Sequence, residues 1–305
     1  MNKFKKKLVG GAYTLAGKTV AINGATGGLG RQLCARFCAL GASLLLLDRN
    51  KKRSEGLIAE LKREYPALVA EHITLDLEDM ERVKAVSDEL CERGIDYLVL
   101  NAGAYSIPRH KCATGFDNVF QINFLAPYYM ARRLLPTVAA RGGRVVAVSS
   151  IAHNYSKINE NDVDFSCVKA ASKVYGNAKR YLTYALFGLD GYGTALAVAH
   201  PGIAVTNITA HYPPLVYKMI KHPMKVIFMS PKKACLPILC AMFEDLGPSE
   251  WLGPRVFNVW GLPRKQKLKT ATAEERAKIC EIAEDAGTWG CGFSFFSFEK
   301  RTKRT

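Results

Sequence analysis

The sequence predicts a doubly wound α/β fold, in which helices cover both faces of one mostly parallel sheet. Over the first 200 residues, short apolar runs alternate with longer segments that have a helical pattern. Continuous apolar strands separated by helices are typical of a parallel sheet buried on both faces. The chain has 305 residues, is 49% hydrophobic, and shows no linker, low-complexity tract or internal repeat. We therefore expect a single domain over residues 1–305.

The expected strands are short runs of apolar residues. The run after Ser43 consists of four leucines, so this strand is expected to be buried on both faces. The six runs cover residues 18–23, 43–47, 73–75, 97–100, 144–148 and 194–198.

The segments between these runs have apolar side chains recurring on one helical face. In the first segment, Leu33 and Phe37 lie four residues apart and therefore share a face. The second is rich in charged residues and predicts an amphipathic helix. The five helices are expected at residues 29–40, 51–65, 77–93, 116–135 and 170–187.

The pattern loosens after Pro201. The stretch 207–229 is apolar, aromatic and basic, and it contains three prolines. Beyond it the sequence predicts a helix at 234–246, a last strand at 255–259 and a charged helix at 273–285.

Positive charge is concentrated at the two ends of the chain. Of the net charge of +16, four lysines among the first seven residues contribute +4, and residues 299–304 contribute +3. We expect a basic N-terminal extension at 1–16 and a basic tail at 287–305, which either solubilise the protein or attract it to an anionic membrane surface. These basic residues are not interleaved with stacking aromatics, so nucleic-acid binding is not expected.

The sequence indicates a cytoplasmic protein. The apolar stretch after the first lysines is broken at once by Gly10 and Gly11, so no secretory signal is expected. The longest apolar runs are far shorter than the ~18 residues needed to span a bilayer. Nine scattered cysteines without a Cys-x-x-Cys pair indicate reduced, mostly buried thiols.

A glycine-rich loop lies between the first expected strand and the first expected helix. Its spaced glycines are Gly24, Gly28 and Gly30. Glycines let the backbone approach a phosphate, and a helix N-terminus offers free N–H groups and a positive dipole end. A plain tight turn would explain the glycines alone, but their place between strand and helix favours a dinucleotide site.

Acidic residues follow the next two strands. Asp48 lies about 20 residues past the glycines, where a carboxylate accepts hydrogen bonds from ribose hydroxyls and favours NAD. Arg49 could instead hold the 2′-phosphate of NADP, and a solvated Asp–Arg pair is the third interpretation. Asp76 either accepts a hydrogen bond from the adenine amino group or caps the next helix.

Tyr175 and Lys179 lie four residues apart on the last of the five helices, so they share one face. An ammonium near a phenol favours the phenolate and lowers the pKa of the phenol from about 10. A phenol tuned in this way can exchange a proton near neutral pH, as alcohol oxidation requires. Ser149 and Ser150 end an upstream strand.

In this order the motifs resemble the short-chain dehydrogenase/reductase family, over residues 17 to 210 and into the rest of the chain. Asn23 stands where the family usually has threonine. The resemblance implies a Rossmann-type sheet and hydride transfer between NAD(H) or NADP(H) and an alcohol or carbonyl compound. The cofactor positions that it implies are Gly24, Thr26, Gly28, Leu29, Gly30, Asp48, Arg49, Asp76, Leu77, Asn101, Ala102, Gly103, Tyr175, Lys179, Pro201, Gly202 and Thr206.

The catalytic residues that the resemblance implies are Asn123, Ser150, Tyr175 and Lys179. Tyr175 would take the alcohol proton while Ser150 holds the oxygen and stabilises its charge. Lys179 would lower the pKa of Tyr175 and bind the ribose hydroxyls, and Asn123 would support a water chain. The family often forms dimers or tetramers, so a homodimer or homotetramer is left open.

A second segment imitates the catalytic motif. Residues 165–171 match the family's Tyr-Ser-x-Ser-Lys-Ala-Ala except that Phe165 stands in place of the tyrosine. A phenyl ring has no proton to give, so this register would be inactive. We favour the register with Tyr175, because that residue begins an amphipathic run suited to packing on a sheet.

The Ser-Ser-Ile-Ala-His run at 149–153 and the long insert before Tyr175 resemble the retinol dehydrogenase-like branch of the family. The stretch at about 207–229 lies where the family carries its substrate lid, and its apolar and aromatic residues favour a steroid- or retinoid-like substrate. Its spaced lysines would also suit a membrane surface. The alternatives are a non-catalytic dinucleotide-binding regulator and a membrane-associated protein on the same fold.

No metal site is expected from the sequence. The six histidines show no ligand spacing with cysteine or carboxylate. His153 and His200 adjoin motif residues, and we expect them to serve local packing.

Overall fold

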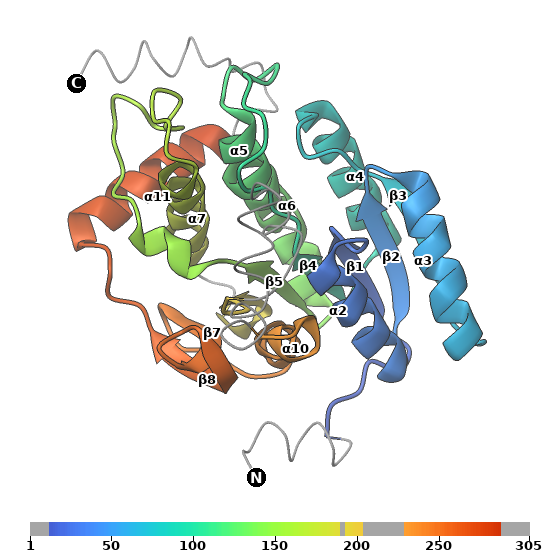
Figure 1. The fold of residues 1–305 in the computed structure, drawn as a ribbon. Helices are drawn as coiled ribbons and strands as arrows, with labels where there is room; N and C mark the ends of the chain where they lie inside the picture. Colours follow the sequence, from blue (N-terminus) through green and yellow to red (C-terminus); the bar gives the residue numbers. More distant parts are fainter. Residues whose placement is uncertain (1–11, 190–192, 204–228, 288–305) are drawn as a thin grey trace, which may run out of the picture.

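The computed structural model describes residues 12–189, 193–203 and 229–287. Within them, eight strands form one sheet in the order β3-β2-β1-β4-β5-β6-β7-β8 (Figure 1). All neighbours pair in parallel except β7 and β8, which are antiparallel. The strands are β1 (Thr19–Asn23), β2 (Ser43–Asp48), β3 (Ala70–Thr74), β4 (Tyr97–Leu100), β5 (Arg144–Val148), β6 (Leu196–Ala199), β7 (Glu250–Val256) and β8 (Trp260–Lys267).

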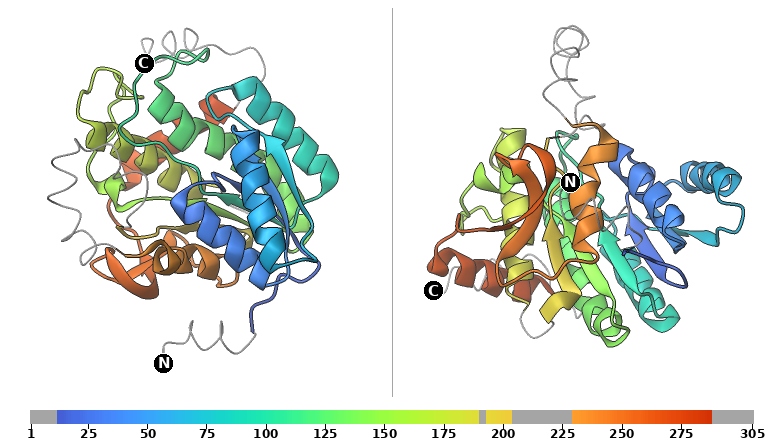
Figure 2. Two further views of the ribbon diagram at one scale, coloured as in Figure 1. Left: turned by 45° about the vertical axis from the view of Figure 1, so that its right-hand side comes forward. Right: turned by 90° about the horizontal axis from the view of Figure 1, so that it is seen from below.

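Helices cover both faces of this sheet, as the sequence predicts (Figure 2). One apolar core joins the sheet to α4, α6, α7 and α11, and the other joins it to α2, α3 and α10. The helices are α2 (Gly28–Ala39), α3 (Lys51–Glu64), α4 (Met80–Arg93), α5 (Asn118–Phe120), α6 (Ala126–Ala140), α7 (Ala171–Phe187), α9 (Pro231–Ala234), α10 (Leu236–Ala241) and α11 (Ala273–Gly287). Short turns of other helix types are the π-helical η1 (Gln121–Leu125) and the 3₁₀-helical η2 (Ile151–Asn154) and η3 (Gly193–Ala195).

Most elements match the sequence-based expectation to within a few residues, but the last strand does not. The predicted strand at 255–259 is wrong, because Phe257 and Asn258 have positive φ angles of 50° and 59° and turn the chain. Val259 N donates to Val256 O at 2.9 Å across this turn. The region is therefore a hairpin of β7 and β8.

The strand order brings four predicted motifs to one edge of the sheet. It reverses between β1 and β4, and in open α/β sheets ligands bind at the carboxyl ends of the strands around such a point. The segments that follow β1, β4, β5 and β6 therefore lie along the same edge. They carry the glycine loop, residues 101–103, Ser150 and residues 201–202.

Some sequence-based expectations lie outside the described residues. These are Thr206, the tail at 288–305, all but the last residue of the stretch 207–229, and most of the extension at 1–16. Within the part of the chain that the structure describes, no helix is both long enough and apolar enough to cross a bilayer.

A buried ion pair joins α11 to α7. The Arg180 guanidinium donates to the Glu275 carboxylate through Nε and Nη2, each at 2.6 Å. It also donates to His153 O at 3.0 Å and to Thr270 O at 2.7 Å. The Arg180 side chain is 3% exposed and that of Glu275 is 13% exposed, so water does not replace these bonds easily.

We expect Glu275→Gln to destabilise the protein by about 3 kcal/mol, because it leaves the Arg180 guanidinium buried without its counter-charge. Urea unfolding measures this change in free energy. Glu281→Gln is the matched control: its carboxylate lies 3.0 Å from Lys278 Nζ but is 64% exposed. The control should cost less than about 1 kcal/mol. Equal losses in the two variants would contradict the assignment.

Candidate active site

Tyr175 and Lys179 both lie on α7 and share a face, as the sequence predicts. The Lys179 Nζ is 5.8 Å from the centroid of the Tyr175 ring. It donates a hydrogen bond to Val148 O at 2.9 Å, at the end of β5. The competing register is wrong, because Phe165 lies in a turn with a φ of 55° and Lys169 precedes the helix.

Ser150 caps the start of η2 and is the second residue after the end of β5. Its backbone is extended, and its hydroxyl accepts a hydrogen bond from Ala152 N at 3.2 Å. The Ser150 side chain lies close enough to that of Tyr175 to lower the pKa of the tyrosine by hydrogen bonding. Two of the predicted catalytic groups are therefore neighbours.

The pKa values of the pair differ from the expectation. Burial raises the pKa of Tyr175 to about 12, against the opposing effect of the Ser150 hydrogen bond, and the nearby Tyr105 raises it further. Burial lowers the pKa of Lys179 to about 7. The predicted lowering of the tyrosine pKa by the ammonium is not observed in this structure. The physical reason is that burial penalises the charged forms of both groups.

Asn123 lies in η1, a single π-helical turn between α5 and α6, and is fully buried. Its side-chain Nδ2 donates to Ala104 O and Val119 O, both at 2.8 Å, and its Oδ1 accepts from Ala104 N at 3.2 Å. Single π-turns inside helices are frequent at functional sites. Here the turn places the amide beside the segment that follows β4.

The glycine loop has a shape that suits a pyrophosphate. Gly24 has a φ of 66°, and a Cβ there would lie 2.8 Å from Ala102 Cα. A Cβ on Gly30 would lie 2.1 Å from Gly24 O. The helix that follows, α2, begins without a side-chain cap and has no acidic residue in its first turn. In contrast, Asn50 and Asp79 cap α3 and α4, so the first N–H groups of α2, unlike those of α3 and α4, have no side-chain cap in the way of an anion.

Asn23, the residue that departs from the family pattern, ties this loop to the end of β4. Its Oδ1 accepts from Ala102 N at 2.7 Å. In return, Asn101 Nδ2 donates to Gly24 O at 2.9 Å and to Asn23 O at 3.1 Å. The buried Nδ2 of Asn23 has no hydrogen-bond partner among the described residues. These contacts have no local signal in the sequence, because they join residues about 80 positions apart.

Asp48 is buried at the end of β2 and faces the glycine loop. Its carboxylate accepts from Ser54 Oγ at 3.2 Å and from Thr26 Oγ1 at 3.5 Å. Burial raises the pKa of this carboxyl group, and the bonds from Ser54 and Thr26 oppose the rise. Arg49 is exposed and makes no ion pair with Asp48 in the part of the chain that is described. A solvated Asp–Arg pair is therefore excluded.

Asp76 does not cap the following helix, so that alternative is wrong. Its Oδ1 accepts from Glu78 N at 3.0 Å in a local turn, and Leu77 is buried beside it. Asp79 is the residue that caps α4, through a bond from Arg82 N at 3.0 Å. The adenine role of Asp76 is the remaining prediction.

The two histidines beside the motifs pack locally, as expected. His153 Nδ1 is 2.7 Å from Ser150 O, and burial lowers the pKa of this ring to about 4. His200 stacks on Trp251 with ring centroids 4.5 Å apart. Its Nδ1 accepts from Gly202 N at 3.0 Å, which holds the turn after β6. These bonds fix the backbone on which the site residues lie.

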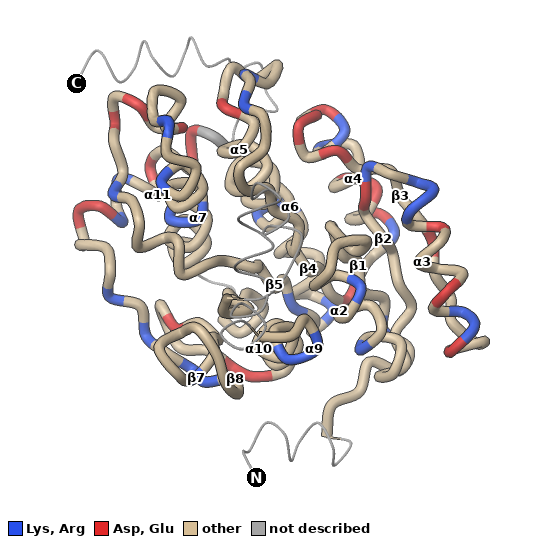
Figure 3. The backbone as a smooth tube through the Cα atoms, in the orientation of Figure 1, with Lys and Arg blue, Asp and Glu red and all other residues tan. Residues whose placement is uncertain are grey.

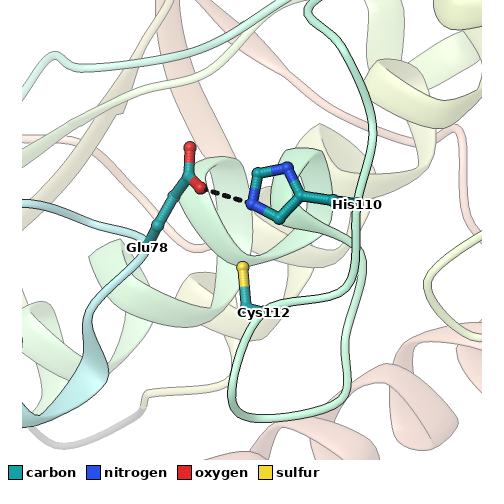
Figure 4. A group of neighbouring side chains, drawn as sticks. All are labelled: Glu78, His110 and Cys112. Carbon is teal, nitrogen blue, oxygen red and sulfur yellow. Dashed lines mark ion pairs between the residues drawn. The ribbon is translucent and has the colours of Figure 1, made fainter.

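Three side chains of metal-ligand type gather near the start of α4, which the sequence did not indicate (Figure 4). Ligand atoms of Glu78, His110 and Cys112 lie within 4.8 Å of one another. The His110 Nε2 lies 2.8 Å from Glu78 Oε2, and its Nδ1 lies 3.1 Å from Asn118 Nδ2. Because that amide nitrogen also donates to Pro108 O, Nδ1 is an acceptor and Nε2 carries the ring proton.

This arrangement describes a hydrogen-bonded His–Glu pair rather than a metal centre. A metal at Nε2 would have to displace the proton that bonds Glu78. Burial also raises the pKa of the Cys112 thiol to about 11, so a metal would have to displace the thiol proton as well.

Tyr105 is a site residue that the sequence did not single out. Its ring meets that of Tyr175 edge to face, with centroids 5.4 Å apart. It follows residues 101–103 by two positions, so the turn after β4 reaches Tyr175 as well as the glycine loop.

Comparisons with known proteins agree with this geometry. The family model for short chain dehydrogenases matches residues 18–183. Human retinol dehydrogenase 14 is 33% identical over 225 residues, which are 66% of this chain and 66% of that protein. Mouse retinol dehydrogenase 12 is 28% identical over 288 residues, which are 88% of each protein. The match to the human protein therefore spans just under two thirds of its length.

Solved structures show the same fold. The structure of an uncharacterised protein from Mycobacterium paratuberculosis has a TM-score of 0.67 and 26% sequence identity, and the match covers 96% of this chain and 95% of that one. A short-chain dehydrogenase from Sphingobium yanoikuyae in complex with NADPH has a TM-score of 0.56 and 22% identity over 73% of this chain and 83% of that one. The matched family model covers more than half of the chain and contains the glycine loop, Ser150, Tyr175 and Lys179. The chain therefore belongs to the short-chain dehydrogenase/reductase family of NAD(P)-dependent oxidoreductases.

Proposed function

We propose that this protein transfers a hydride between a nicotinamide cofactor and a lipophilic alcohol or its carbonyl form. The observation that carries the proposal is that Tyr175 and Lys179 lie beside Ser150 at the edge of the sheet where the glycine loop also lies. A bound nicotinamide would supply or accept the hydride. The protein contributes the proton, the position of the substrate oxygen and the exclusion of water.

In this proposal Tyr175 and Ser150 hold the substrate oxygen between their hydroxyl groups. With a pKa of about 12, Tyr175 is protonated near neutral pH and is ready to give its proton to a carbonyl oxygen. In the reverse direction the same oxygen takes the alcohol proton, which requires the phenolate. The raised pKa therefore places Tyr175 in the protonated form that a carbonyl substrate requires. Ser150 donates to the substrate oxygen and stabilises the charge that develops there.

Lys179 and Asn123 lie next to Tyr175 and Ser150 in the proposed site. The Lys179 amine lies beside the Tyr175 ring, and a Cβ on Gly103 would lie 3.7 Å from its Nζ. It is therefore placed between the catalytic tyrosine and the turn after β4, where the ribose hydroxyls would bind. Asn123 borders the same turn through Ala104. We assign it the role of supporting a water chain that leads the proton away.

Two observations support an apolar substrate. Tyr175 packs against a small apolar cluster formed by Val119, Phe165 and Val174, with Ile107 at its border. The segment at about 207–229 is rich in methionine, tyrosine and branched aliphatic residues, and we propose that it is the substrate lid. The related proteins that carry the name retinol dehydrogenase favour a retinoid among such compounds.

We propose NAD(H) as the preferred cofactor, because the buried Asp48 carboxylate would bond ribose hydroxyls and repel a 2′-phosphate. We also propose a cytoplasmic enzyme that assembles as a dimer or tetramer and touches membranes peripherally. The eight cysteines within the described residues are all free thiols, which supports a reducing compartment.

The proposal is tested by turnover, followed at the absorbance of the reduced nicotinamide. Retinal, a steroid ketone and a polar sugar are offered with NADH and NADPH in parallel. We expect the lipophilic carbonyls to be reduced and NADH to be the better donor. A preference for the sugar would contradict the lipophilic substrate, and a preference for NADPH would contradict the role of Asp48.

We expect Tyr175→Phe to reduce turnover by a factor of at least about 10³, because the phenyl ring cannot exchange a proton. Cofactor binding, measured by nicotinamide fluorescence, should stay within about twofold, since the hydroxyl contributes little to holding the dinucleotide. Tyr184→Phe on the same helix is the matched control, and it should keep most of the activity. If Tyr175→Phe keeps substantial activity, the proton donor must be another residue.

The buried amine of Lys179 predicts a dependence of stability on pH. Its pKa falls from 10.5 in the unfolded chain to about 7 in the folded protein, so between these values the unfolded state binds more protons. Stability therefore rises with pH in this window, by up to about 1.4 kcal/mol per pH unit for one full proton. We expect Lys179→Met to lose this slope in urea unfolding between pH 7 and 10. Parallel curves for the two proteins would contradict the lowered pKa.

A further inference from the structure

The hairpin of β7 and β8 ends in an exposed apolar tip. Phe257 is 87% exposed, Trp260 51% and Leu262 36%. These are three of the five large apolar side chains that are exposed among the described residues, and they fall within six consecutive positions. A single exposed apolar side chain needs no explanation, but such a cluster indicates a contact surface.

The fold itself does not account for Phe257. The residue adopts a φ of 50° in the turn, followed by Asn258 at 59°. Asparagine tolerates this left-handed region, whereas phenylalanine does not favour it. The exposed ring also gains almost nothing from burial in the folded protein. A residue that is both strained and exposed is better explained by a contact outside the chain.

The same hairpin is strongly basic, and the one acidic residue in its two strands is Glu250, at the first position of β7. Residues 251–270 contain five basic residues and no acidic one. All five are exposed: Arg255, Arg264, Lys265, Lys267 and Lys269. Within the described part of the chain only Lys265 has an ion-pair partner, Glu244 at 3.7 Å. Figure 3 shows basic residues on this hairpin at the lower edge of the molecule.

Protection of the sheet edge explains part of this pattern. β8 is the outer strand, and lysines on an outer strand discourage pairing with another chain. That function calls for charge along the strand and for few exposed aromatic residues. The apolar tip therefore requires a partner that accepts aromatic rings and attracts cations together.

An anionic lipid surface has both properties. Tryptophan and phenylalanine insert at the level of the lipid headgroups, while arginine and lysine remain against the phosphates. A protein partner would need a surface well beyond three side chains to form a stable interface. We propose that the β7–β8 hairpin docks on an anionic membrane, with Phe257, Trp260 and Leu262 in the headgroup layer and Arg255, Arg264 and Lys267 against lipid phosphates.

The tip also lies beside the rim of the candidate site. Ile203 N donates to Val259 O at 3.1 Å, and a Cβ on Gly202 would lie 2.3 Å from the same oxygen. Gly202 belongs to the turn after β6 that is expected to border the nicotinamide. On the proposed function, docking through the hairpin would hold the substrate entrance near the bilayer in which a lipophilic substrate dissolves. The docking itself does not depend on that activity.

The test is co-sedimentation of the full chain with phosphatidylcholine vesicles that contain or lack phosphatidylserine. We expect binding to the anionic vesicles that weakens in high salt. Phe257→Asn together with Trp260→Thr should weaken this binding at least about tenfold, because the pair removes both aromatic rings. Asparagine suits the positive φ at position 257 and threonine suits an outer strand, so the fold should be kept. Arg264→Gln together with Lys267→Gln should weaken binding by a similar factor.

Matched controls lie at the opposite edge of the sheet. Lys52→Gln with Lys62→Gln removes two exposed charges from α3, and Val69→Thr removes an exposed apolar side chain next to β3. These variants should bind the vesicles as the unchanged protein does. The thermal midpoint and nicotinamide binding of each variant show that it is folded.

Three outcomes would overturn the proposal. The unchanged protein could fail to bind anionic vesicles. The hairpin variants could bind as well as the controls, which would assign the membrane contact to the basic ends of the chain. The hairpin variants could instead change the oligomeric state with no loss of lipid binding, which would make the tip a protein interface. None of these outcomes depends on turnover, so an inactive enzyme would leave the result readable.

Discussion

The position of α7 against the sheet depends on hydrogen bonds made by buried polar side chains of this helix. A buried polar group is costly unless it is hydrogen-bonded, so each of these groups accepts only one placement of the helix. Asn177 donates to Val163 O, and Thr183 donates to Lys179 O and meets Ser149 at the end of β5. Lys179 donates to Val148 O, and Arg180 donates to the Glu275 carboxylate. Together these bonds determine how α7 is rotated about its axis and where it lies along that axis. Tyr175 reaches Ser150 because of that placement.

The fold was largely predictable because its signals are local. Four leucines in a row, or apolar residues four apart, report burial without reference to the rest of the chain. The same holds for α7, where the four-residue spacing of Tyr175 and Lys179 determines that they share a face. The strand at 255–259 was misplaced because a hairpin turn with two non-glycine residues at positive φ has a weak sequence signal.

The parts of the site that could not be predicted are long-range contacts. Asn23 looked like a mild departure from a family pattern, yet its amide accepts a bond from Ala102 and thereby joins two loops. His110 and Cys112 meet Glu78 only because the chain folds back over more than 30 residues. Burial is likewise a property of the whole packing, so the raised pKa of Tyr175 could not be obtained from its spacing to a lysine.

In the structure, Lys179 and Ser150 affect the pKa of Tyr175 differently from what the sequence predicts. A lysine one turn away was expected to stabilise the phenolate, but the amine is buried with the phenol, and burial lowers its own pKa to about 7. An amine that is protonated only part of the time lowers the pKa of a neighbouring phenol less than a permanent cation does. Ser150 is the neighbour that does favour the phenolate. In the proposed mechanism Ser150 therefore acts on Tyr175 as well as on the substrate oxygen, and Lys179 acts mainly through its position between the tyrosine and the turn after β4.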